Sequence, residues 1–370
     1  MGERWSKERI WEWYDARPWL RGCNFMGSDC ANRIDQWQEL GFEERLETAD
    51  RELALCAETG FNTVRLIPEF IVWYQEHDGF FERFDRYLDV CAKHGISAMV
   101  VLGNDCMPPM HDGWKMPSVG EQHYDWGYHG GRKISQHGQF NTVGYHLLDD
   151  PKFVQPHYDF VREIVTRYKD DERIIIWDVY NEPGNSNRKD MSLPHLKKFF
   201  EICREIDPIQ PLTCGLWRGI LGGKFEEDKI EMEIQKFGYD NSDIISFHQY
   251  GTYENNCALI KCLRRSGRPL INTEWLARCQ HNNVEEIFPL YYLEKIGCYC
   301  WGFVAGKYQT YEPYNSAWSR YEKDPKIDFD FTKWFHDLYR PSLRPYNPKE
   351  IEIIKRFCSL ADEDFKKDGR

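Results

Sequence analysis

Long apolar runs are missing from this chain of 370 residues. Because a membrane-spanning helix needs roughly 20 consecutive apolar residues, we expect no transmembrane segment. The start of the chain also lacks the apolar stretch of a secretory signal peptide, which favours a cytoplasmic location. Runs of lysine and arginine are missing as well, and the net charge is −12. Nucleic acids and membrane surfaces are therefore not expected as partners.

Regular spacing of cysteine and histidine is absent too. The 13 cysteines are an odd number, and they are not spaced as metal ligands are. Buried, reduced thiols are the simplest interpretation in a cytoplasmic protein. The histidines between residues 103 and 147 form no His-x-x-x-His pair on a helix, so we expect neither a metal nor a cofactor. No linker or low-complexity tract divides the sequence, and residues 1–370 are predicted to form a single catalytic domain.

Aromatic residues, in contrast, are abundant and make up 15% of the chain. This share exceeds what a hydrophobic core requires and indicates clefts that are lined with rings. Sugars have apolar C–H faces that stack on such rings, so carbohydrate is a suitable ligand class. Packing in the core and on helix faces accounts for the remaining aromatic residues.

An apolar strand followed by an amphipathic helix recurs along the chain, which is typical of parallel β-α units. Residues 45–59 and 80–94, for example, carry apolar side chains at helical spacing, and a glycine follows each segment. Eight strands are expected, the number at which a parallel sheet can close. The sequence thus predicts an α/β protein with a single (β/α)8 TIM barrel. The predicted strands lie at residues 20–25, 62–67, 96–102, 174–183, 212–215, 244–250, 270–274 and 297–303.

A long segment separates the third and fourth predicted strands. Residues 103–147 are rich in glycine, proline, histidine and aromatic residues, and a loop of this length inside a compact domain is usually functional. Because it follows the C-terminal end of a strand, we expect it to form a wall of the active site. Residues 337–370 are predicted to be a C-terminal tail outside the barrel, with a short helix near residues 351–358 and a frayed end from residue 362.

Two predicted strands end in a glutamate. Glu182 follows the apolar run that starts at Ile174, and Glu274 ends the run that starts at Leu270. The C-terminal ends of barrel strands are where such enzymes carry their chemistry. The fourth and seventh strands lie roughly opposite each other across the barrel mouth. Hydrolysis of a glycosidic bond needs one carboxylic acid to protonate the leaving oxygen and a second carboxylate to attack.

The segments Tyr180-Asn181-Glu182-Pro183 and Asn272-Thr273-Glu274-Trp275 resemble the acid/base and nucleophile motifs of clan A glycoside hydrolases. Family 5, which includes cellulases and mannanases, is the closest likeness. The resemblance implies that Glu182 is the acid/base and Glu274 the nucleophile of a retaining double displacement. It also implies that further side chains bind the sugar or support the glutamates: Arg65, Asn181, His248, Tyr250 and Trp301.

The expected roles have physical reasons. Arg65 would keep Glu274 ionised, since a nearby cation lowers the pKa of a carboxyl group, and Tyr250 could donate a hydrogen bond to the same carboxylate. Glu182 should have a raised pKa because of burial and of the charge on Glu274, so that it carries a proton near neutral pH. Asn181 would hold the sugar 2-hydroxyl, and Trp301 would lie under the sugar that is cleaved.

One position departs from the family pattern. Many members have a histidine at the end of the third strand, where this chain has Asn104-Asp105. Both residues are candidates for binding sugar hydroxyls, and Asp105 could hold two adjacent hydroxyls as in exo-acting sites. Trp73 is a candidate sugar platform, with ordinary packing as the alternative. The polar segment at residues 28–37 could close one end of the cleft and make a pocket.

The sequence therefore predicts a retaining β-glycoside hydrolase of the β-mannoside or β-glucoside type. A cytoplasmic location would limit its substrates to short imported oligosaccharides, which favours exo action. An endo-β-1,4-mannanase or cellulase-like enzyme is the first alternative, and a transglycosidase differs only in how well water is excluded from the acceptor. A carbohydrate-binding barrel without catalytic activity is the alternative from another class. No pattern in the sequence indicates an oligomeric state.

Overall fold

The computed structural model describes residues 2–107, 116–122, 143–217 and 232–367. Its eight parallel strands follow one another in the order β5-β4-β3-β2-β1-β8-β7-β6. The two outer strands meet through a bridge between Leu216 and Phe247, and the His248 amide donates to the Leu216 carbonyl at 2.8 Å. The predicted (β/α)8 barrel is thereby confirmed. The strands are β1 (Arg21–Asn24), β2 (Thr63–Leu66), β3 (Ser97–Val101), β4 (Ile174–Asn181), β5 (Leu212–Gly215), β6 (Ile245–His248), β7 (Leu270–Trp275) and β8 (Gly297–Cys300).

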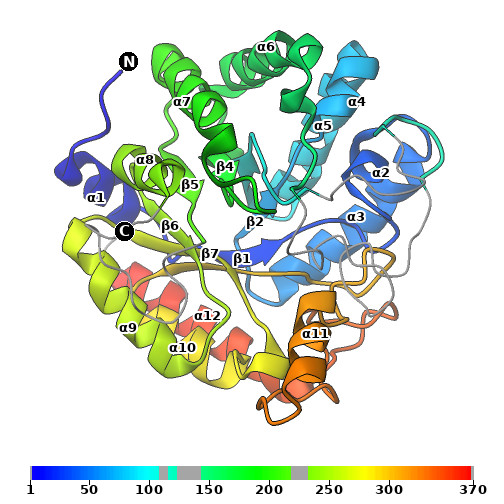
Figure 1. Cartoon of the computed structure of the whole chain (residues 1–370). Coiled ribbons are helices and arrows are strands. Elements are labelled where there is room, and N and C mark those ends of the chain that lie inside the picture. Colours follow the sequence, from blue (N-terminus) through cyan, green and yellow to red (C-terminus); the bar gives the residue numbers. More distant parts are fainter. Residues whose placement is uncertain (1, 108–115, 123–142, 218–231, 368–370) are drawn as a thin grey trace.

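Helices surround the strands (Figure 1). The helices expected from apolar spacing are confirmed as α3 (Phe42–Glu58), α5 (His77–Lys93), α6 (Pro151–Tyr168), α7 (Leu193–Ile206) and α10 (Val284–Leu293). Six further helices were not predicted from the sequence, and most of them have too few turns for their apolar positions to define a period. These are α1 (Lys7–Asp15), α2 (Arg33–Trp37), α4 (Phe70–Gln75), α8 (Glu233–Asn241), α9 (Tyr253–Leu263) and α11 (Asn315–Lys323).

Helix α1 covers the end of the barrel opposite the strand-terminal glutamates. Its buried Ile10 and Tyr14 belong to one apolar cluster with side chains from the strands, among them Met99, Ile176 and Ile271. The Tyr14 hydroxyl also accepts a hydrogen bond from the Gly297 amide at 2.8 Å. Packed side chains therefore fill the barrel floor among the described residues, and the strand-terminal glutamates lie at the opposite end. No helix among the described residues is long and apolar enough to cross a membrane.

The long segment after β3 is described only in part. Most of it, residues 108–115 and 123–142, lies outside the described residues, so its role as a wall of the active site stays a prediction. Residues 116–122 lie against α2 and α4. The Gly120 amide donates to Gln38 Oε1 at 2.7 Å, and the Val119 amide donates to Gln75 Oε1 at 2.9 Å.

The C-terminal helix α12 runs from Pro348 to Lys367, much longer than predicted. Its buried side chains recur at helical spacing, and Asp362 forms an ion pair with Arg21 of β1 at 2.8 Å. The predicted fraying is therefore wrong for residues 362–367, and residues 368–370 lie outside the described residues. The ion pair explains the difference, because it ties the last turns of the helix to the barrel.

Replacement of Ile10 by alanine tests the packing of α1. Ile10 is fully buried, whereas Ile209 is 46% exposed and serves as a matched control. We expect Ile10→Ala to lower the free energy of unfolding by about 2–5 kcal/mol, because it leaves a cavity in the barrel floor. Ile209→Ala should change it by less than about 1 kcal/mol. Urea unfolding of the two variants measures this, and equal losses would contradict the packing described for α1.

Candidate active site

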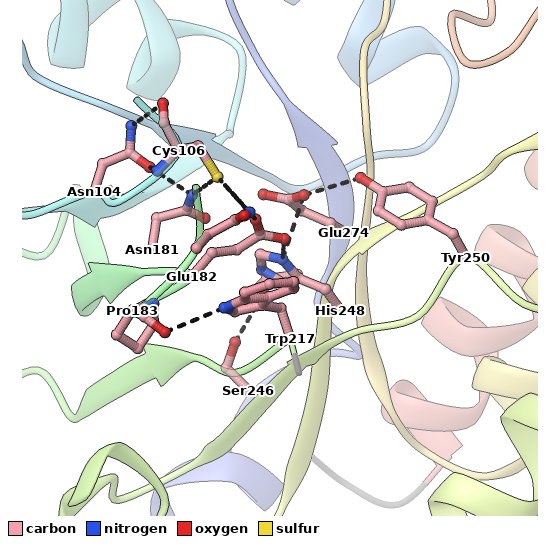
Figure 2. Close-up of polar contacts among 12 residues, drawn as sticks. Asn104, Cys106, Asn181, Glu182, Pro183, Trp217, Ser246, His248, Tyr250 and Glu274 are labelled. Atoms are coloured by element: carbon pink, nitrogen blue, oxygen red, sulfur yellow. Dashed lines mark hydrogen bonds and ion pairs between the residues drawn. The ribbon is translucent and has the colours of Figure 1, made fainter. Parts of the chain in front are cut away.

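Glu182 and Glu274 face each other at the mouth of the barrel. Glu182 directly follows β4, and Glu274 lies near the end of β7. One carboxylate oxygen of each, together with Nδ1 of His248, form a group of atoms that all lie within 4.8 Å of one another. Figure 2 shows the imidazole of His248 between the two carboxylates. The strand positions inferred from the sequence therefore bring the two acids together.

Arg65 of β2 is the central cation of the site and is 1% exposed. Its Nη1 donates to Glu274 Oε1 at 3.0 Å and to Asn24 Oδ1 at 2.9 Å. Its Nε and Nη2 both donate to Asp178 Oδ2, at 3.0 and 2.7 Å. Nη2 also donates to Asn181 Oδ1 at 2.6 Å. The guanidinium thus links side chains from β1, β4 and β7, and its charge is shared between Glu274 and Asp178.

Three side chains contact the Glu274 carboxylate, and two of them donate hydrogen bonds to it. Besides Arg65 on Oε1, the Tyr250 hydroxyl donates to Oε2 at 2.9 Å, and His248 Nδ1 lies 3.3 Å from the same oxygen. Both carboxylate oxygens are held, so the carboxylate has one defined orientation towards the centre of the mouth.

The backbone at Glu182 is strained. Its φ is 45°, a conformation that residues with a side chain rarely adopt. The Glu182 amide donates to the Gly215 carbonyl at 3.0 Å, and the Trp217 indole donates to the Pro183 carbonyl at 3.1 Å (Figure 2). The next residue but one, Gly184, also has a positive φ of 83°. Neighbouring strands therefore hold the turn that carries the catalytic candidate.

Three side chains contact the Glu182 carboxylate. His248 Nδ1 lies 2.7 Å from Oε1, and the Cys106 thiol lies 2.8 Å from Oε2. The amide nitrogen of Asn185 also donates to Oε2. Oε1 of Glu182 thus contacts His248, and Oε2 contacts both Cys106 and Asn185.

The pKa values of the two acids shift in directions opposite to those expected from the sequence. Burial would raise the pKa of Glu182, but the hydrogen bond and charge of His248, with the hydrogen bonds of Cys106 and Asn185, together lower it. Burial raises the pKa of Glu274, and His248 and Arg65 offset this only in part. The expectation is therefore wrong for the sugar-free protein. It considered Arg65 and the two acids but not a histidine that lies closer to Glu182 than to Glu274.

Asn104 and Asn181 form one chain of hydrogen bonds. Asn104 Oδ1 accepts from Asn181 Nδ2 at 2.8 Å, and Asn181 Oδ1 accepts from Arg65. Asn181 thus lies beside the glutamates, as the family likeness implies. Asn104, which is 5% exposed, orients Asn181 and the following Cys106 amide rather than facing the cleft.

Asp105 does not face the mouth, so the prediction that it binds sugar hydroxyls is corrected. It is fully buried, and its Oδ2 accepts from the Gly184 amide at 2.6 Å. Its Oδ1 accepts from Tyr180, Arg188 and Ser192. These four donors leave no oxygen for a ligand. Asp105 instead holds the turn after Glu182, which explains an acidic residue at this position.

Trp73 is likewise not part of the mouth. It lies in α4, is 7% exposed, and its indole donates to Glu163 of α6 at 3.1 Å. Its ring packs against Phe70 and Phe160. Trp73 therefore belongs to the helical layer, and the packing alternative considered for it is the one observed.

A pocket opens beside Arg65 and Trp301 and contains about 590 Å³ of empty space, including the part that is open to solvent. Its walls come from the segments after β1 and β8. The Lys307 amide donates to the Ser28 carbonyl at 2.9 Å, which joins the two segments. Ser28, Arg33 and Gln36 of the polar segment at residues 28–37 lie in the lining of this pocket. That the segment closes one end of the cleft stays a prediction.

Several residues of the site were missed by the sequence analysis. Asp178 and Asn24 were detectable, because each is a polar residue within or at the end of an apolar strand and so needs a buried partner. Cys106 and Asn185 follow strand ends without any pattern that marks them. Tyr314 lies after β8, and the charge of Glu274 contributes to its raised pKa, second to burial.

A pair of carboxylic acids that can flank a glycosidic bond, at the open end of a (β/α)8 barrel, is the arrangement of a glycoside hydrolase. The sequence comparison agrees. The family described as cellulase, glycosyl hydrolase family 5, matches residues 27–307. The chain belongs to glycosyl hydrolase family 5.

Individual relatives are distant. Mannan endo-1,4-beta-mannosidase 8 of Oryza sativa subsp. japonica is 22% identical over 218 residues, 55% of this chain and 53% of the rice protein. The match thus spans about half the length of this relative. The exo-beta-1,4-mannosidase of Opitutaceae bacterium strain TAV5 superposes with a TM-score of 0.57 at 15% identity over 94% of this chain and 60% of its own.

A family 5 mannosidase from Rhizomucor miehei, solved with mannosyl-fructose, gives a TM-score of 0.57 at 15% identity. Here the match covers 96% of this chain and 95% of the other. At such identities the superpositions establish the barrel fold alone.

The buried acid Asp337 in the pocket lining predicts a pH effect on stability. Burial raises its pKa from 3.8 to about 7, and the Thr310 hydroxyl donates to its Oδ2 at 2.7 Å. The pKa of Asp337 is higher in the folded state than in the unfolded state. Its contribution to the free energy of unfolding is therefore fully present below about pH 4 and is lost as the pH rises towards 7. We expect Asp337→Asn to reduce this decline by at least about 1 kcal/mol.

Urea unfolding between pH 4 and 8 measures the effect. Asp170→Asn is the control, because the Asp170 side chain is 72% exposed. Glu52, whose pKa burial also raises to about 7, is retained in both variants, so the decline should lessen rather than vanish. Parallel profiles for the wild type and Asp337→Asn would contradict the assignment.

Proposed function

We propose that the protein is a retaining β-mannoside hydrolase that removes sugars from a chain end or cleaves short oligosaccharides. The retaining mechanism rests on one observation: oxygens of Glu182 and Glu274 lie within 4.8 Å of each other. Retaining enzymes keep their carboxyl groups about 5–5.5 Å apart, whereas inverting enzymes need about 6.5–9.5 Å for a water molecule.

In the first step Glu182 gives its proton to the glycosidic oxygen while the bond from that oxygen to C1 breaks. The electron pair of the broken bond stays on the leaving oxygen, and Glu274 forms a new bond to C1. In the second step water loses a proton to Glu182 and attacks C1, which releases the Glu274 carboxylate. The sugar leaves with its original configuration, and both acids return to their starting states.

Glu182 must carry a proton when this cycle begins, although its contacts in the site lower its pKa. His248 Nδ1 contacts both carboxylates, at 2.7 and 3.3 Å. The imidazole can therefore give a proton to Glu182 and take one from Glu274 through the same nitrogen. Arg65 and Tyr250 then stabilise the ionised Glu274, which makes it the nucleophile.

The mannoside preference is supported by the relatives, whose names describe mannosidases and a mannanase. Exo action is supported by the pocket beside Trp301, whose walls are joined by the hydrogen bond from the Lys307 amide to the Ser28 carbonyl. The rice relative is named as an endo-acting enzyme, so an endo-mannanase is the second candidate. A barrel that only binds carbohydrate does not need two carboxylates whose oxygens are both oriented by hydrogen bonds and ion pairs.

Release of nitrophenol from nitrophenyl β-mannoside, glucoside, galactoside and xyloside tests the chemistry. We expect the mannoside to be cleaved fastest, and Glu274→Ala to lose at least about 10³-fold in kcat because the nucleophile is gone. Azide should restore activity to Glu182→Ala and yield the β-glycosyl azide. Glu254→Ala, on the outer helix α9, is the control and should behave as wild type. An α-configured azide product would contradict retention.

The early products of mannohexaose hydrolysis distinguish exo from endo action. With a label on the reducing end, an exo enzyme releases unlabelled mannose and leaves labelled mannopentaose first. An exo site that ends in the pocket beside Trp301 predicts this pattern. Labelled dimers and trimers at the earliest times would contradict exo action and support the endo-mannanase.

A further inference from the structure

A thiol lies against the proposed acid/base. Cys106 follows β3, is half-buried, and its Sγ lies 2.8 Å from Glu182 Oε2 (Figure 2). The other oxygen of Glu182 contacts His248. Among the described residues, Cys106 is the cysteine that hydrogen-bonds a catalytic candidate. The mechanism above does not use it.

The direction of the S–H bond follows from the groups around the sulfur. The amide nitrogens of Asn185 and Asn181 donate towards Sγ at 3.2 and 3.5 Å. Because these two donors occupy the sulfur lone pairs, the thiol hydrogen is left to point at Glu182. The Cys106 amide donates to Asn104 Oδ1 at 3.0 Å, which fixes the backbone that carries the thiol.

A thiol is a weak donor and a weak acceptor, whereas a hydroxyl is strong in both roles. Glu182 must exist as a carboxylate and as a carboxylic acid within one catalytic cycle. His248 and Asn185 already donate to its carboxylate form. A strong third donor would hold Glu182 ionised, and a residue without any donor would leave Oε2 with Asn185 alone.

We propose that Cys106 is a positioning residue for Glu182, which donates weakly to the carboxylate and lets the carboxylic acid form when the proton arrives. This inference rests on the proposed role of Glu182 as acid/base. The protonation of Glu182 then depends on two contacts, that of His248 with Oε1 and that of Cys106 with Oε2.

Other titratable groups also face Glu182 and set the background against which the thiol acts. They come from the strands and from the segments that follow them: His248, Glu274, Arg65, Tyr250 and Tyr314. None of them contacts Oε2 in the hydrogen bonds of the described residues. A change at Cys106 therefore alters one oxygen of Glu182 and leaves these groups in place.

The test is the pH profile of kcat/KM for Cys106→Ser and Cys106→Ala with nitrophenyl β-mannoside. The basic limb of this profile reports the acid of the free enzyme. Serine donates more strongly, so we expect its basic limb to move to lower pH by about 0.5–1 unit. Alanine removes the donor, and its limb should move to higher pH by a similar amount. A merely structural role would not shift the two variants in opposite directions.

Leaving groups provide the second readout. Dinitrophenyl β-mannoside needs no protonation, so both variants should cleave it within about 3-fold of wild type, which also shows that they fold. Cys257→Ser, a half-buried cysteine of α9, is the matched control and should keep the wild-type profile.

The inference is overturned if both Cys106 variants keep the wild-type basic limb, or if both limbs move in the same direction. A different result would contradict the proposed role of Glu182 as the acid. If Glu182 is not the acid, Glu182→Gln would still cleave methyl β-mannoside, which has a poor leaving group, at the wild-type rate. Loss of that activity in Glu182→Gln, together with unchanged Cys106 profiles, would reject the role of the thiol alone.

Discussion

The buried guanidinium of Arg65 is the interaction on which the site depends. A fully buried cation is costly to remove from water, and it is retained only where charges and hydrogen bonds compensate it. Asp178 and Glu274 supply the charges, while Asn24 and Asn181 supply further acceptors. Arg65 and these partners come from four strands, β1, β2, β4 and β7. The geometry of the barrel mouth is therefore fixed by electrostatics as well as by apolar packing. Removal of one partner would leave the other charges unpaired, so the network holds together as a unit.

This network sets the electrostatics of the two glutamates. Arg65 divides its charge between Asp178 and Glu274, so Glu274 is only partly stabilised as an anion and burial raises its pKa. His248 lies between the acids and favours the ionised form of Glu182. These contacts lower the pKa of Glu182 and leave the pKa of Glu274 raised. In our account the bound substrate, the imidazole and the weakly donating thiol of Cys106 together allow the proton to move to the acid that needs it.

The sequence predicts β4 and β7 well because each is buried on both faces and reads as an apolar run that ends in polar residues. It also predicts which strand ends carry the glutamates, Arg65, His248 and Tyr250. It does not predict where a side chain after a strand end points. Asp105 was a candidate for the cleft but turns inward to hold Gly184. Trp73 was a candidate sugar platform with packing as the alternative, and it packs on α6. Cys106 and Asn185 contact Glu182 through turns whose shape depends on tertiary contacts, which no local pattern encodes.

Trapping of the covalent intermediate tests the central claim most directly. The protein is incubated with 2-deoxy-2-fluoro-β-mannosyl fluoride, digested, and its peptides are analysed by mass spectrometry. The fluorine slows both steps, and the fluoride leaving group keeps the first step faster than the second, so the glycosyl-enzyme accumulates. The account predicts one fluorosugar on the peptide that contains Glu274. A label on Glu182, or hydrolysis of mannosides without any labelled peptide, would contradict the proposed double displacement.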